Sequence, residues 1–421
     1  MFNLEEFLYF VLLMVNIPLI YYGYKAKLLF KSPLFLMYFY SVFIFNVIGS
    51  CVVFFPDLLI YGQHNYFSYD FFYILFFQSL SFYLFLPFHR NKTSKEHPVV
   101  IKLSIKRYVV ILFILSLFII LLFLLKYGLP PILTVDFSIG NNLLVKERTL
   151  FFESIGSFWL HQLGFYTMPQ FLTIIIYLLY KTKNSNLNKV LFYSMFLFST
   201  ALSLSFLHKT PLVLFLFQLF IAKALFEREI KIKMIIISTI VIFIAILSWY
   251  ILSLSGNTLV DGSFIYKSIF NRLFGVYSLS LAIVPNLVDT HGLYYGATLI
   301  NPFGLFSFEQ VNLSKEIHMF LFGFEGNAPA PAIGYAYADF GWMGVFIFII
   351  GSNVLILMYQ YILNSIKNRI ISTVLLSYLL LKIMFISMTS IFDTLLNPKE
   401  LFILLTLVGL YYMQNLKRGK I

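Results

Sequence analysis

Residues 108–127 read YVVILFILSLFIILLFLLKY, an apolar run that Lys106 and Arg107 precede and that Lys126 closes. A helix needs about 20 residues to cross the hydrocarbon core of a bilayer, so this run has the length and composition of a transmembrane helix. The whole chain has the same character, because 60% of its 421 residues are hydrophobic and 11% are charged. A soluble protein of that composition could not cover its surface with polar side chains. The sequence therefore predicts an all-α polytopic membrane protein.

Similar apolar runs recur along the chain, and together they predict about 11 transmembrane helices. Their approximate bounds are 7–23, 33–55, 70–88, 108–127, 158–180, 190–207, 211–226, 234–255, 339–359, 370–389 and 399–415. We expect the first run to stay in the protein as a helix and not to be removed as a signal peptide. Glu5 and Glu6 precede it, and no small-residue cleavage site follows it.

Basic residues predict how these helices are oriented. Most of the 30 lysine and arginine residues fall in the connections that follow odd-numbered spans or at the C-terminus. Because basic residues collect on the cytoplasmic side, we expect the N-terminus outside and the C-terminus in the cytoplasm. The net charge of +12 is then explained by topology and does not indicate nucleic-acid binding.

This topology divides the chain into three sections of a single integrated membrane domain. Residues 1–255 hold the first eight spans, residues 256–338 form one large loop on the outside with short helices, and residues 339–421 hold the last three spans. A connection as long as 256–338 is unusual for a simple link between helices. We therefore expect most candidate functional residues in this loop.

The first part of the loop, residues 261–286, has the pattern of an amphipathic helix that carries Lys267 and Arg272 among large apolar residues. Such a helix can lie at the membrane surface with its basic side chains on lipid headgroups. The alternative is that the two side chains bind an anionic substrate. The sequence leaves both interpretations open.

The second part, residues 291–324, is expected to be loop-like and contains His291 and His318. Neither histidine has a second metal ligand at helical spacing, and Cys51 is the one cysteine of the chain. A zinc site or another divalent-metal site is therefore not expected. A lone loop histidine is more often a surface residue than a catalytic one.

The third part, residues 323–344, reads GFEGNAPAPAIGYAYADFGWMG and is the most patterned stretch of the chain. Residues before proline favour extended conformations, so we expect a rigid extended segment that leads into the next helix. The first amide groups of that helix would attract an anion. Alternatively, Gly341 and Gly344 serve only to let helices approach closely.

Two lysines lie in or next to predicted membrane spans, where burying a charge costs free energy. Lys209 lies in the short outside turn before the short span 211–226, where it either binds an anion in a hydrated cavity or reaches the lipid headgroups. Lys382 lies inside the span 370–389, and Asp339 and Asp393 are its candidate ion-pair partners.

The stretch 327–344, with its alanine-proline steps and the sequence Asp339-Phe340-Gly341-Trp342 before a span, resembles the signature of the Wzy-type O-antigen and oligosaccharide repeat-unit polymerases. The His208-Lys209 turn, Arg272 and the predicted topology add to the resemblance, which covers essentially the whole chain. It implies a GT-C-like membrane glycosyltransferase in the bacterial cytoplasmic (inner) membrane. The active site would face the periplasm or outside.

The resemblance also implies the substrates and partners. Undecaprenyl-pyrophosphate-linked oligosaccharides would be both donor and acceptor, and the product would be a surface polysaccharide such as O-antigen or capsule. A chain-length regulator and a flippase are the implied protein partners, within the lipid bilayer and without nucleic acid.

The implied reaction defines the groups that the site must supply. A hydroxyl of the acceptor sugar attacks the anomeric carbon of the donor, and undecaprenyl pyrophosphate leaves. Cations must therefore stabilise the leaving group, and a base must take the proton. The candidates for binding pyrophosphate are Lys209, Arg272, Lys267 and Lys382. The candidates for catalysis are Arg272, His318, Glu325, Asp339 and His291. No metal, nucleotide or other cofactor is expected, because the donor already stores the energy.

Two other functions fit a multi-pass protein of this kind. An O-antigen ligase uses the same donor and transfers the glycan to the lipid A core. A lipid-linked oligosaccharide flippase is expected to show two similar halves with comparable loops on both sides. One outside loop dominates this chain, which disfavours the flippase. The ligase shares the topology and differs in the acceptor, and we expect the polymerase that residues 327–344 resemble.

Overall fold

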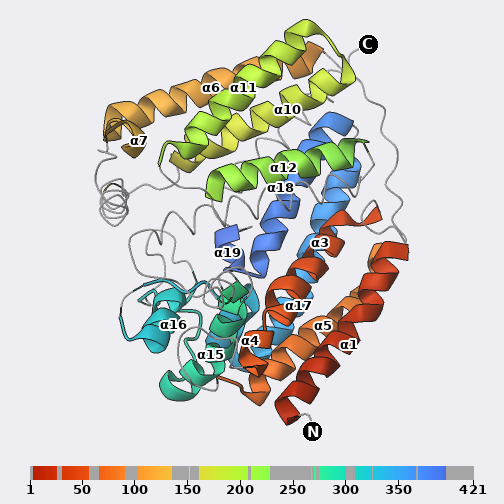
Figure 1. Cartoon of the computed structure of the whole chain (residues 1–421), viewed down its shortest axis with the longest axis vertical. Coiled ribbons are helices and arrows are strands. Elements are labelled where there is room, and N and C mark those ends of the chain that lie inside the picture. The colour runs from red at the N-terminus through yellow and green to blue at the C-terminus, as the bar shows by residue number, and fades with distance from the viewer. Residues whose placement is uncertain are drawn as a thin grey trace. The chain divides into compact units, whose positions relative to one another are not determined.

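The structure of the chain is a computed structural model, shown in Figure 1. It describes residues 3–25, 31–55, 66–90, 103–134, 151, 161–206, 210–227, 267, 270–271, 275–299, 307, 309–324, 326–366 and 368–394. Within these ranges all regular elements are helices, and nine of them are long and apolar enough to cross a membrane. The predicted all-α class and multi-pass membrane character are therefore confirmed for the described part of the chain.

These nine helices coincide with nine of the predicted spans. They are α1 (Leu4–Lys25), the helix Pro33–Phe54 made of α3 (Pro33–Ser41), η1 (Val42–Ile48) and α4 (Cys51–Phe54), α5 (Tyr69–Arg90), α6 (Leu103–Tyr127), η3 (Gln162–Thr167) with α10 (Met168–Thr182), α11 (Asn186–Leu204), α12 (Thr210–Glu227), α17 (Ala332–Ser365) and α18 (Arg369–Ile386). The predicted spans 234–255 and 399–415 lie outside the described residues. The predicted orientation in the membrane stays a prediction.

The chain forms two compact units. Unit 1 comprises Met1–Lys95, Leu259–Asn364 and Leu379–Leu401, and unit 2 comprises Glu96–Thr258, Ser365–Tyr378 and Phe402–Ile421. Nearly all of the predicted outside loop therefore belongs to the same unit as the first three spans.

Helix α15 (Val276–His291) packs against α4, η1 and α5 in unit 1. A helix was predicted over 261–286, and in the described part it begins at Val276 and continues to His291. Of the two interpretations left open, a position at the membrane surface does not fit this part, because Leu281, Ala282, Ile283 and Val284 are fully buried. The hydroxyl of Ser278 donates to the carbonyl oxygens of Phe45 and Asn46 at 2.7 and 2.9 Å. Both acceptors belong to η1, a π-helical stretch of the second span, and π-helices are frequent at functional sites.

Polar side chains form a hydrogen-bonded chain in the interior of unit 1. Asn46 Nδ2 donates to Gln78 Oε1 at 3.5 Å, and Gln78 Nε2 donates to the hydroxyl of Tyr38 at 3.5 Å. The hydroxyls of Tyr38 and Ser352 lie 3.1 Å apart. All four side chains are buried. These hydrogen bonds join η1, α5, α3 and α17, as polar side chains commonly join helices within a membrane.

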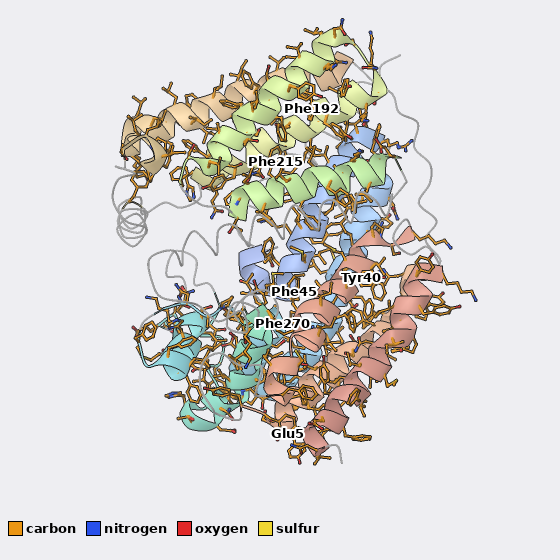
Figure 2. All side chains as sticks on the ribbon, viewed as in Figure 1. Glu5, Tyr40, Phe45, Phe192, Phe215 and Phe270 are labelled. Atoms are coloured by element: carbon orange, nitrogen blue, oxygen red, sulfur yellow. The ribbon has the colours of Figure 1, made fainter. Side chains whose placement is uncertain are left out.

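Helix α10 lies at the centre of unit 2, where it packs against α6, α11 and α12 (Figure 1). The hydroxyls of Thr173 and Ser199 lie 2.7 Å apart, and the α10–α11 contact is thereby polar as well as apolar. The helices α11 and α12 meet through aromatic rings such as those of Phe196 and Phe215, whose centroids are 5.8 Å apart. Figure 2 labels Phe215 together with Phe192 of α11.

Candidate functional site

Helix α17 is interrupted at Gly341, where the chain would enter the predicted span. Gly341 has φ 58° and ψ −142°, a conformation that only glycine adopts readily. A Cβ added at Gly344 would overlap the carbonyl oxygen of Ala336. The helix begins at Ala332 and not near the predicted position 339, so an outer segment 332–340 precedes the break. Residues 326–331 have no regular secondary structure, and the extended conformation that the prolines predict for them stays a prediction.

Asp339, in the outer segment of α17, is bound by the turn that follows α15. Its Oδ1 accepts hydrogen bonds from the backbone N–H groups of Gly296 and Thr298 at 3.1 and 3.2 Å. Its Oδ2 accepts a bond from the Thr298 hydroxyl at 2.6 Å. The Asp339 side chain is 1% exposed, so these bonds replace water. We call this group of contacts the Asp339 clamp.

The same turn also binds the backbone of the outer segment. The N–H groups of Tyr294 and Tyr295 donate to the carbonyl oxygens of Ala338 and Asp339, each at 3.0 Å. These carbonyls lie where the break at Gly341 ends the outer helical segment, and helix ends leave carbonyls without intrahelical partners. The turn therefore satisfies the backbone of the break as well as the Asp339 carboxylate.

A short helix, α16 (Leu313–Phe322), lies in the segment that was expected to be loop-like, so the prediction for 291–324 is wrong there. The side chain of Asn312 accepts a bond from Lys315 N at 3.3 Å and caps the first turn. Gly323 ends the helix with φ 71° in the left-handed conformation. These two signals were present in the sequence, and they could have located the helix.

His318 lies on α16 and is held in one orientation. Its Nδ1 is 3.0 Å from the carbonyl oxygen of Phe324, and a carbonyl only accepts, so Nδ1 carries the proton. The rings of Phe322 and Phe324 lie 4.6 and 5.0 Å from the imidazole. A Cβ at Gly326 would overlap the imidazole, so the absence of a side chain there makes room for the ring. In the neutral imidazole Nε2 is then the proton acceptor.

The other predicted site residues are distributed differently. His291 is exposed at the end of α15, Lys267 is half-buried, and Lys382 is half-buried on α18. The Asp339 carboxylate accepts hydrogen bonds from Gly296 and Thr298, and the side chain of Asp393, the other candidate ion-pair partner of Lys382, lies outside the described residues. The remaining candidates lie outside the residues whose structure is described, namely Lys209, Arg272 and Glu325.

Residues that the sequence analysis did not select also belong to this region. Thr298 makes two of the three clamp bonds. The Tyr294 hydroxyl is buried without a hydrogen-bond partner among the described residues. Burial raises the pKa of Tyr294, and the negative charges of Glu316 and Asp339 raise it further. Tyr294 therefore stays protonated at neutral pH and can donate a hydrogen bond. Gly292 and Gly296 were the sequence signal for the turn, and in the structure both have positive φ.

Among the described residues, no group of three or more His, Cys, Asp or Glu side chains could hold a metal ion. The described residues include a positioned imidazole on α16 and, on α17, a buried carboxylate that accepts three hydrogen bonds. An imidazole with one nitrogen fixed as a donor can take a proton at the other.

The chain was compared with protein-family models, with curated proteins and with solved structures, and no match was found.

Proposed function

We propose that this protein polymerises undecaprenyl-pyrophosphate-linked oligosaccharide repeat units into a surface polysaccharide, on the outer side of the bacterial cytoplasmic membrane. The proposal rests on the resemblance of residues 327–344 to the repeat-unit polymerases. The observation that carries it is the geometry of His318, whose Nδ1 is occupied by the Phe324 carbonyl. A reaction in which a hydroxyl becomes a nucleophile needs such a base.

In the proposed reaction a hydroxyl oxygen of the acceptor sugar forms a bond to the anomeric carbon of the donor. The bond between that carbon and the pyrophosphate oxygen breaks, and its electron pair leaves with undecaprenyl pyrophosphate. The hydroxyl proton passes to Nε2 of His318. Asp339 suits the role of base less well, because its buried carboxylate oxygens already accept three hydrogen bonds. Glu325 and His291 stay as further candidates.

Cations are proposed to bind the pyrophosphate, whose negative charge grows as the bond breaks. Arg272 and Lys209 are the first candidates, since a guanidinium can form paired hydrogen bonds to phosphate oxygens. Lys267 and Lys382 are the candidates for second contacts. The bond energy of the donor suffices for the reaction, so the proposal includes no nucleotide or other cofactor.

The experiment uses the full-length protein in lipid nanodiscs with a synthetic lipid-linked repeat unit and no nucleotide. Glycan chains with two or more repeats are expected from the unaltered protein, and His318→Ala is expected to lower the rate by about 10²-fold or more. Glu316→Gln, an exposed change on the same helix, is the matched control. Failure of the unaltered protein to lengthen its native repeat unit would contradict the polymerase. Transfer to lipid A core without polymer would identify a ligase instead, and transport without transfer would identify a flippase.

A further inference from the structure

We infer that Asp339 is a positioning residue that holds the helix of His318 in place, and that it takes no part in the proton transfer. This inference rests on the proposed function, because it assigns a role to a second candidate residue of the proposed reaction. It changes the interpretation of Asp339, which the sequence alone presents as an acidic side chain beside a membrane span.

The Asp339 carboxylate is buried and bound by the turn that follows α15. Three donors from Gly296 and Thr298 bind its two oxygens, and the side chain is 1% exposed. Charge-assisted hydrogen bonds of this kind are stronger than neutral ones. A carboxylate that is enclosed in this way is well suited to fix a turn and poorly suited to reach a substrate hydroxyl.

The turn is also connected to the start of α16. Ala297 lies between Gly296 and Thr298, and its carbonyl oxygen accepts a hydrogen bond from Val311 N at 2.8 Å. Val311 directly precedes Asn312, whose side chain caps α16. The start of the helix is therefore only a few bonds away from the Asp339 clamp, and His318 lies on the second turn of that helix.

Helix α16 has a separate connection to the irregular segment 326–331 and to the outer segment of α17. The carbonyl oxygen of Ser314 accepts a bond from Ala328 N at 3.0 Å, and the hydroxyls of Ser314 and Tyr335 lie 3.3 Å apart. Helix α16 thus has two independent attachments to α17, one through the Asp339 clamp and one through Ser314. Loss of the clamp should loosen the beginning of α16 without unfolding the helix.

Two substitutions at Asp339 distinguish positioning from proton transfer. Asp339→Asn keeps the shape of the side chain, so its oxygen can still accept from Gly296 and Thr298 and its amide can donate to the Thr298 hydroxyl. Asp339→Ala leaves the buried N–H groups of the turn without an acceptor. A positioning residue tolerates the first change and not the second, whereas a base is lost in both.

The experiment combines hydrogen exchange with polymerisation, using the full-length protein in nanodiscs. In Asp339→Ala, amide exchange in peptides 294–299 and 311–318 should become about 10-fold faster or more. The rate should fall by about 10²-fold, as small misplacements of reacting groups do. Asp339→Asn should stay within about threefold of the unaltered protein in both measurements. Asp289→Ala, which removes an exposed carboxylate at the end of α15, is the control and should change neither.

Each contrary result overturns a different part of the inference. Unchanged exchange over 311–318 in Asp339→Ala would show that the clamp does not reach α16. Loss of polymerisation in Asp339→Asn with unchanged exchange would make Asp339 a chemical participant. Full polymerisation by His318→Ala would refute the base role of His318, and with it the positioning role. The exchange pattern of Asp339→Ala, which does not depend on activity, would still show whether the clamp exists.

Discussion

The hydroxyl of Tyr337 donates a hydrogen bond of 2.8 Å to Oδ2 of Asp70, across 267 residues of sequence. Asp70 lies in the first turn of α5, and Tyr337 lies in the outer segment of α17. The Tyr337 ring also meets Trp342 edge to face at 5.8 Å, directly after the break at Gly341. The segment that carries Asp339 is therefore attached to the spans on one side and to the turn 294–298 on the other.

Tyr337→Phe should destabilise the protein by about 1–2 kcal/mol, because it removes a hydrogen bond to a carboxylate and keeps the ring. The apparent midpoint of thermal unfolding in nanodiscs measures the change. Tyr295→Phe removes the hydroxyl from a side chain that is 77% exposed and serves as the control. Equal midpoints for the two variants would contradict a stabilising role for the bond between Tyr337 and Asp70.

Ser278 and Ser280 form a matched pair on α15. Ser278→Ala removes the hydrogen bonds to the Phe45 and Asn46 carbonyls and should lower the free energy of unfolding by about 1 kcal/mol. The Ser280 hydroxyl is buried with no hydrogen-bond partner among the described residues, so Ser280→Ala should be neutral or stabilising. Thermal unfolding of both variants checks the prediction. A larger loss in Ser280→Ala than in Ser278→Ala would exclude this docking of α15 on η1.

The break in α17 should depend on glycine. Gly341→Ala places a residue with a Cβ in a backbone conformation with φ 58° and should lower the free energy of unfolding by about 1–3 kcal/mol. Gly351→Ala lies in the same helix with open space around its added Cβ and should be neutral or slightly stabilising. The difference between the two unfolding midpoints is the measurement, and no difference would mean that α17 runs straight through position 341.

Gly326→Ala should lower polymerisation while the protein stays folded, because the added Cβ would displace the His318 ring. A loss of about 10-fold or more in rate is expected, since catalytic groups tolerate little displacement. Gly323→Asn is the control, because asparagine tolerates the left-handed conformation that ends α16. The two variants are compared in the nanodisc assay. Normal polymerisation by Gly326→Ala would contradict the need for a fixed imidazole.

Arg272→Ala should leave expression intact and reduce the surface glycan to single repeat units, since it removes the cation proposed to bind pyrophosphate. The length distribution of glycan from cells that carry the variant checks this prediction. Arg272→Lys keeps the charge but not the paired donors, so an intermediate length is expected. Long chains of normal length in the Arg272→Ala strain would remove Arg272 from the proposed site.

Sequence patterns were sufficient to find some features of residues 294–340 and insufficient for others. Asn312 and Gly323 have the local chemistry of helix ends, so α16 could have been found from the sequence. The hydrogen bonds between Asp339 and Thr298 could not have been found from the sequence, because the two residues are 41 positions apart and no periodic pattern relates them. His318 and Asp339 were both selected as candidates, but their different surroundings became visible only in the structure.

Apolar runs such as 108–127 determine the membrane helices by themselves, because a bilayer requires about 20 apolar residues whatever the rest of the chain does. The prolines of 323–344 likewise predict an extended segment, since proline restricts the backbone locally, whereas the break at Gly341 was found only in the structure. Tertiary structure decided what the polar residues do. The carboxylate of Asp339 is bound by backbone N–H groups from distant residues, and the Phe324 carbonyl binds Nδ1 of His318, which leaves Nε2 as the nitrogen that we propose takes the proton.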